Sequence, residues 1–143
     1  MGKRIGKYKV SKKESEISLR DGGNIDGPVN LNGATSYSTE TVAAGNGGGN
    51  ATALSTTSTV SFVTTATNSS HVSLADGATG QIKIIVHKTR SNSTDLVITP
   101  ANFAAGSTLT SNLASRSVGL VFDGTNWQVI SGEITGTAEM VIG

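Results

Sequence analysis

Short stretches of alternating apolar and polar residues fill the chain between residues 57 and 132. Alternation of this kind gives an extended strand one apolar face, and no segment shows a convincing helical period. Turns rich in Gly, Asn and Asp separate the stretches at intervals of about 8 to 12 residues. Strands are therefore expected over residues 57–66, 70–77, 80–88, 94–100, 107–111, 117–124 and 126–132. The pattern predicts an all-β fold, either an antiparallel β-sandwich of jelly-roll-like form or a small barrel.

Two segments are predicted to form hairpins. The segment from Leu74 to Pro100 contains two apolar runs joined by polar turns, and "LVFDGTNWQVI" places Phe122 and Trp127 on either side of the tight turn "DGTN". Such a turn suits a hairpin, and pairing would bring the two aromatic side chains together. The alternation assigns one set of side chains to the core: Val60, Phe62, Val72, Leu74, Ile82, Ile84, Val86, Leu96, Ile98, Leu120, Phe122, Trp127 and Val129.

Three further elements are expected outside this series. The segment "YSTETVAA", from Tyr37 to Ala44, is a strand candidate. A short helical turn is expected after Thr99, with Pro100 at its first position and Gly106 ending it. The tail "EITGTAEMVIG" offers another edge strand, or a segment that pairs with a neighbouring subunit.

The first 33 residues are interpreted as an extended basic arm with a Gly-rich connector, ahead of a β-rich body over residues 34–143. The net charge of the chain is only +1, but its first 13 residues carry six bases and no acid. Such a terminus either becomes ordered against a partner surface or remains a solvated tail. Nucleic acid is not the expected partner, because the segment has one aromatic residue and no recognition helix. Binding to an acidic protein surface is assigned to Lys3, Arg4, Lys7, Tyr8, Lys9, Lys12 and Lys13.

The composition predicts one domain with a thin core. Hydrophobic residues make up 36% of the 143 residues and aromatic residues only 4%. Globular domains usually contain roughly 45 to 50% apolar residues, although that figure also counts glycine. Burial between subunits would supplement such a core, so self-association is expected.

No pattern in the sequence points to catalysis. The chain has no cysteine, and His71 and His87 have no third ligand at metal-binding spacing, so both are expected at a surface or an interface. Asp76 and Asp123 each precede a glycine, where turn formation explains them. There is no Gly-x-Ser-x-Gly motif, and the run "GNGGGNAT" lacks the Lys-Ser/Thr of a phosphate-binding loop. We predict no enzymatic activity, no metal and no cofactor, and neither a secretion signal nor a membrane span is expected.

A particular set of residues lies between residues 72 and 132. It consists of Leu74, Asp76, Gly77, Gly80, Gln81, Lys83, the run Thr99–Asn102, Gly106 and the run Phe122–Trp127. In this set the chain resembles small structural proteins of tailed bacteriophages, especially marine and cyanobacterial ones. The resemblance covers somewhat under half of the chain.

This resemblance implies a virion structural protein. A small β module with a basic arm suits decoration or cementing of the capsid shell, which places it on the virion surface after assembly in the host cytoplasm. The expected partners are the major capsid protein, gripped through the arm, and further copies of the chain in a homotrimer, with no membrane partner. The alternative is a fibre, spike or tail-adhesion module that binds a host surface glycan.

Overall fold

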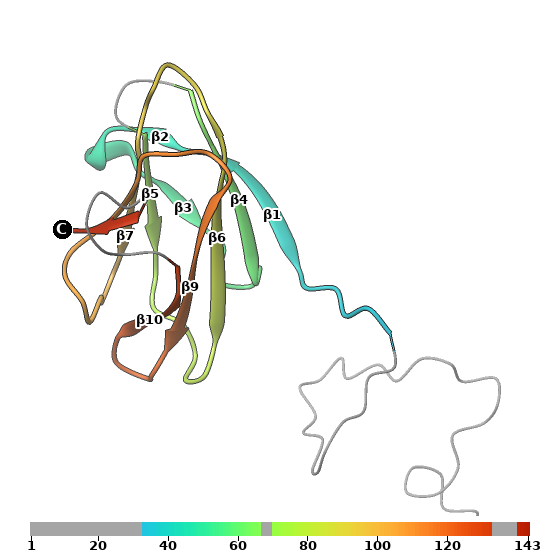
Figure 1. Cartoon of the computed structure of the whole chain (residues 1–143). Coiled ribbons are helices and arrows are strands. Elements are labelled where there is room, and N and C mark those ends of the chain that lie inside the picture. Colours follow the sequence, from blue (N-terminus) through green and yellow to red (C-terminus); the bar gives the residue numbers. More distant parts are fainter. Residues whose placement is uncertain (1–32, 67–69, 133–139) are drawn as a thin grey trace, which may run out of the picture. The chain divides into compact units, whose positions relative to one another are not determined.

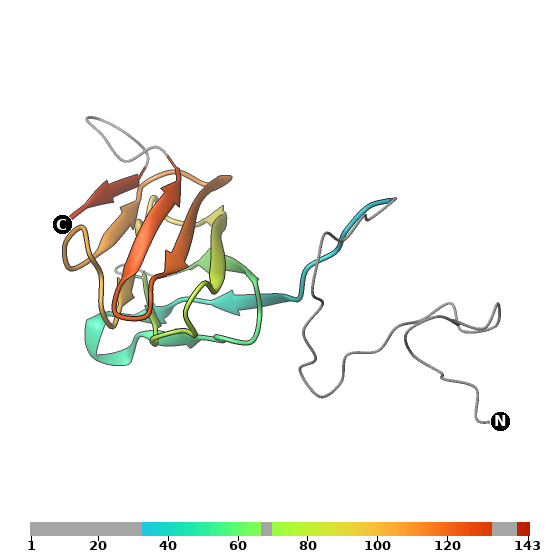
Figure 2. The same ribbon diagram turned by 90° about the horizontal axis from the view of Figure 1, so that it is seen from below.

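The computed structural model describes residues 33–66, 70–132 and 140–143, and these residues form two β-sheets that pack against each other (Figures 1 and 2). The strands are β1 (Thr39–Ala43), β2 (Gly45–Asn46), β3 (Thr52–Leu54), β4 (Val60–Thr65), β5 (Ser70–Leu74), β6 (Ile82–Arg90), β7 (Leu96–Pro100), β8 (Leu109–Ser111), β9 (Arg116–Phe122), β10 (Trp127–Ser131) and β11 (Met140–Ile142). Among the described residues the single helical element is a 3-10 turn, η1 (Gly48–Asn50). The all-β class is confirmed.

Both sheets mix parallel and antiparallel strands. The five-stranded sheet has the order β1-β4-β6-β9-β10, and the six-stranded sheet has the order β11-β8-β7-β5-β2, with β3 also paired to β5. β1, β4 and β6 are parallel to one another, whereas β9 is antiparallel to both β6 and β10. The expectation of purely antiparallel sheets is therefore wrong, and the sheets do not close into a barrel.

The parallel pairs arise because consecutive strands change sheets. From β4 to β7 the chain alternates between the two sheets, so β4 and β6 run in the same direction in one sheet, as β5 and β7 do in the other. Figure 1 shows β4 and β6 side by side. The hairpin predicted between Leu74 and Pro100 is wrong for the same reason, since β6 and β7 lie in different sheets.

The hairpin of β9 and β10 is confirmed. Trp127 lies opposite Phe122 in the antiparallel register, and their ring centroids are 5.2 Å apart. The Asp123 carboxylate organises the turn by accepting hydrogen bonds from the backbone N–H groups of Thr125 at 2.8 Å and Asn126 at 2.7 Å. Gly124 has a φ of 103°, a conformation that a glycine adopts without steric cost. The backbone N–H of Asn126, then the Gln128 amide, hold the pKa of Asp123 below its usual value.

The buried apolar core lies between the two sheets. It consists of Leu54, Val63, Val72, Leu74, Ile85, Leu96, Ile98, Leu109, Val118, Leu120, Phe122 and Trp127. The inward assignment is confirmed for β5, β7, β9 and Trp127, and Val129 packs partly buried against the core.

The inward assignment is wrong for β4 and β6. Val63 and Ile85 point inward there, and the side chains expected inside belong to the opposite face: Val60, Phe62, Ile82, Ile84 and Val86. This orientation buries the polar residues Ser61, Lys83 and His87. Those three are tolerated because they find hydrogen-bond partners on other strands and loops.

Two smaller expectations have different outcomes. Residues 101–106 form no helical turn, because Phe103 bridges to Trp127 and the carbonyl of Asn102 accepts the Trp127 N–H at 2.8 Å. The tail contributes β11, which pairs with β8 at an edge of the six-stranded sheet, as expected of an edge strand.

Candidate functional site

The basic residues assigned to shell binding lie outside the described residues, so their role stays a prediction. They are Lys3, Arg4, Lys7, Tyr8, Lys9, Lys12 and Lys13.

Several residues of the set between residues 72 and 132 make structural contacts. Asn102 Nδ2 donates to Asp76 Oδ2 at 2.8 Å, and Trp127 Nε1 donates to the carbonyl of Ala75 at 3.1 Å. A Cβ on Gly77 would lie 3.0 Å from the Trp127 ring. Gln81 Oε1 accepts the backbone N–H of Ala78, and Gln81 Nε2 donates to the carbonyl of Thr56. These contacts join the connections after β5, β7 and β9, so these residues have a structural role.

Lys83 is a fully buried cation on β6, and it joins β1 to the connection between β3 and β4. Its Nζ donates to the carbonyls of Ser55 at 2.7 Å and Ser58 at 2.6 Å, and to Glu40 Oε1 at 3.2 Å. Glu40 Oε1 also accepts the backbone N–H of Ser55 and the hydroxyl of Ser61. All three ammonium donors therefore have acceptors, which is what a buried charge requires.

The surroundings of this pair shift both pKa values. Burial lowers the pKa of Lys83, and the adjacent Glu40 carboxylate opposes that shift. Burial alone would raise the pKa of Glu40, but hydrogen bonds from Ser61, Lys83 and Ser55 outweigh it and leave the pKa below its usual value. All three Lys83 donors are occupied, and Glu40 Oε1 accepts from Lys83, Ser55 and Ser61, so the pair has a structural role.

His87 is buried, which corrects the expectation of a surface or interface position. Its Nδ1 lies 3.1 Å from Ser111 Oγ, and its Nε2 lies 3.3 Å from Thr65 Oγ1. Because Ser111 Oγ donates to the carbonyl of Leu113, it is placed to accept a hydrogen bond from Nδ1–H of His87. Burial and then the charge of Arg90 lower the pKa of His87. His71 is half-buried on β5 in the other sheet, so the two histidines do not form a pair.

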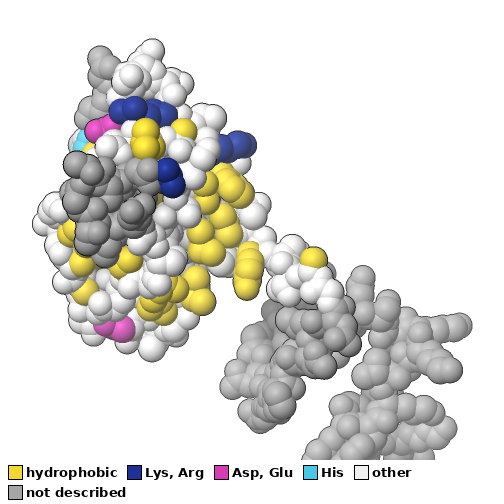
Figure 3. All heavy atoms as spheres, viewed as in Figure 1, with side chains coloured by type: hydrophobic (Ala, Val, Ile, Leu, Met, Phe, Trp, Pro, Cys, Tyr) yellow, Lys and Arg dark blue, Asp and Glu magenta, His cyan; other side chains and the backbone are white. Residues whose placement is uncertain are grey.

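The outer face of the five-stranded sheet carries an apolar surface. We call it the outer patch and define it as Val60, Phe62, Ile82, Ile84, Val86 and Val121. Cross-strand pairing makes these side chains contiguous, because Ile84 lies opposite Val60, Val86 opposite Phe62, and Ile82 opposite Val121. Ile82 is 47% exposed and the other members are half-buried. In Figure 3, hydrophobic side chains gather over β1, β4 and β6.

One cationic side chain borders the outer patch. Lys88 Nζ lies 5.9 Å from the centroid of the Phe62 ring, within the range of a cation–π contact. Alternation along the strands assigned five of the six patch residues to the core and left Val121 unassigned. The signal for this surface was the run "IKIIV", because an apolar run on both faces of a strand is typical of strands covered on both sides.

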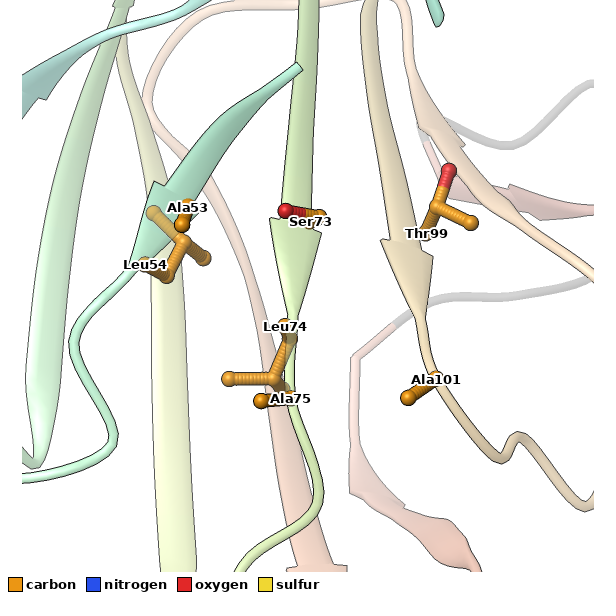
Figure 4. Close-up of a pocket in the computed structure, with 7 residues that line it drawn as sticks. All are labelled: Ala53, Leu54, Ser73, Leu74, Ala75, Thr99 and Ala101. Carbon is orange, nitrogen blue, oxygen red and sulfur yellow. The ribbon is translucent and has the colours of Figure 1, made fainter. Parts of the chain in front are cut away.

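A depression with a volume of about 370 Å³ lies on the six-stranded sheet (Figure 4). Its lining residues come from β3, β5 and β7 and the residues that follow β5 and β7: Ala53, Leu54, Ser73, Leu74, Ala75, Thr99 and Ala101. None of these residues is ionisable. Within the same described ranges, no group of three or more His, Asp or Glu side chains is placed to hold a metal ion.

Comparison of the sequence with protein-family models and with curated proteins gives no match. The part of the chain that the structure describes contains no helix long and apolar enough to cross a bilayer.

Proposed function

We propose that this chain is a structural protein of a tailed-phage virion that decorates or cements the capsid shell and works by assembly, without catalysis. The observation that carries the proposal is the outer patch. Six contiguous apolar side chains on one sheet face leave a surface that is expected to be covered by a partner. The resemblance to phage structural proteins supplies the identity of that partner, the major capsid protein.

In this proposal the body and the arm have separate roles. The outer patch contributes apolar burial to the contact, and the basic arm contributes charge pairing with acidic shell surface, which speeds association more than it adds affinity. The hydrogen bonds around Trp127 and Lys83 keep the five-stranded sheet rigid, so the outer patch has a fixed shape.

Co-sedimentation of the purified chain with capsids that lack it tests the proposal. We expect saturable binding to the shells and a clear loss of binding when residues 1–20 are deleted. A chain that stays in the supernatant would contradict the capsid role. Binding instead to host cells or to their purified polysaccharide would favour the fibre or spike alternative.

A further inference from the structure

The edge strand β1 has unused hydrogen-bonding groups along its outer side. The carbonyl of Ser38 accepts the Val60 N–H at 3.0 Å, and the Ala44 N–H donates to the carbonyl of Thr64 at 2.9 Å. In a parallel ladder this places the backbone groups of residues 38, 40, 42 and 44 toward β4. The N–H and C=O groups of Thr39, Thr41 and Ala43 therefore point away from the sheet. Among the described residues, nothing pairs with them.

Within the described residues, this edge lacks the features that keep sheet edges from pairing. Natural edge strands are usually protected by charged side chains, proline, a bulge or a covering loop. Thr39, Thr41 and Ala43 are exposed and uncharged, and the one charged residue of β1, Glu40, faces inward to Lys83. The opposite edge is different, because residues 102–104 cover the backbone of Trp127 at the start of β10.

The free edge is complementary to itself. If two β1 strands run antiparallel with Thr41 opposite Thr41, then Thr39 lies opposite Ala43 on both sides of a two-fold axis. All three pairs are of the hydrogen-bonded type, since the same three residues carry the free groups on each strand. No like charges meet across the outer side. The same register carries Tyr37, which is 61% exposed, past Ala43 of the second copy, where its ring gains burial.

We propose that β1 pairs with β1 of a second copy of this chain, with Thr41 at the two-fold axis. Two five-stranded sheets then become one continuous sheet. Val60 and Phe62 lie next to β1 on the outer face, so the two outer patches flank the axis and form a larger apolar surface. The dimer is a property of the purified chain and does not depend on the proposed capsid role.

Cysteine cross-linking tests both the contact and its register. The chain has no cysteine of its own, so Thr41→Cys introduces a single thiol. Opposed residues in a hydrogen-bonded antiparallel pair have Cα atoms about 5.5 Å apart, which suits a disulfide. We expect Thr41→Cys to give a covalent dimer under mild oxidation. Thr39→Cys alone should not cross-link, but mixed with Ala43→Cys it should give a heterodimer.

A second variant tests the contact without chemistry. Thr41→Pro removes an N–H that faces away from β4, so the ladder inside the subunit stays intact. We expect light scattering to show a dimer for the original chain and a dissociation constant about a hundredfold higher for Thr41→Pro. At a concentration where both chains are monomeric, their thermal melts should coincide. A monomeric or trimeric original chain, a Thr41→Pro dimer of full strength, or equal cross-linking at residues 39 and 41 would overturn the proposal. These experiments use the purified chain without capsid shells, so a failure of the chain to bind capsids would not change their outcomes.

Discussion

Removing the buried ammonium of Lys83 is expected to be among the most damaging single changes on the surface of β6 that faces the core. In Lys83→Met, the methionine side chain fills the volume of the lysine stem but donates no hydrogen bond. The carbonyls of Ser55 and Ser58 lose their donor, and the Glu40 carboxylate loses its counter-ion.

The magnitude follows from these contacts. Removing one partner of a buried ion pair costs about 3–5 kcal/mol. The Glu40 side chain is 18% exposed, so water compensates part of the loss, and we expect about 3 kcal/mol. For a body of this size that corresponds to a fall in Tm of about 10 °C or more. Glu40→Gln keeps an acceptor for Lys83, Ser55 and Ser61 but leaves the buried ammonium without a counter-ion, so it should also cost about 3 kcal/mol.

Chemical denaturation and thermal melts measure the effect. Lys88→Met is the matched control, because Lys88 lies on the same strand but on the outer face, where its contact with Phe62 contributes under about 1 kcal/mol. The double variant Lys83→Met/Glu40→Gln should lose less than the sum of the single losses, because the two groups interact directly. A Lys83→Met variant no less stable than Lys88→Met would refute the structural role of the buried pair.

Two further predictions concern buried groups. The pKa of His87 is held below 6.5, so below that pH the unfolded chain binds a proton that the folded chain resists, and the free energy of unfolding should fall as the pH drops. Between about pH 7.5 and about pH 5, melts should show this fall in the free energy of unfolding for the original chain and for His71→Gln but not for His87→Gln. An equal fall in His87→Gln would mean that another group causes the pH dependence. Gly77→Ala would place a Cβ 2.7 Å from Gln81 Oε1 and 3.0 Å from the Trp127 ring, so it should lower the free energy of unfolding by about 1–3 kcal/mol in denaturant melts. Gly80→Ala is unsuitable as a control because the φ of Gly80 is 82°. Gly49→Ala, which meets nothing within 4 Å, is the better control, and equal stability of the two variants would mean that the close packing at Gly77 is unimportant.

Local patterns were sufficient for much of the fold. Alternation located the strands from β4 to β10, and the sequence "DGTN" identified the β9–β10 turn because Asp123 and Gly124 have the chemistry that the turn uses. Pairing was harder to predict. A polar connection such as residues 91–95 can return a strand to the same sheet or cross to the other one, and the sequence does not distinguish these outcomes.

The orientation of β6 shows why the candidate site was missed. Its alternation places Ile82, Ile84 and Val86 on one face, and Lys83 and His87 on the other, which favours the first face as the buried one. The structure reverses this choice because Lys83 is satisfied by Ser55, Ser58 and Glu40, and His87 by Ser111 and Thr65. Those partners are distant in sequence, so no local pattern reveals them.

Capsid binding by two matched aspartate variants tests the central claim most directly. Ile82→Asp places a charge in the outer patch, whereas Leu113→Asp changes a side chain of similar exposure, 40% against 47%, in the connection between β8 and β9. If the outer patch is the buried contact, Ile82→Asp should weaken co-sedimentation with shells by about a hundredfold, because an unpaired charge is costly to bury, and Leu113→Asp should bind like the original chain. Equal binding by Ile82→Asp and the original chain would contradict the account.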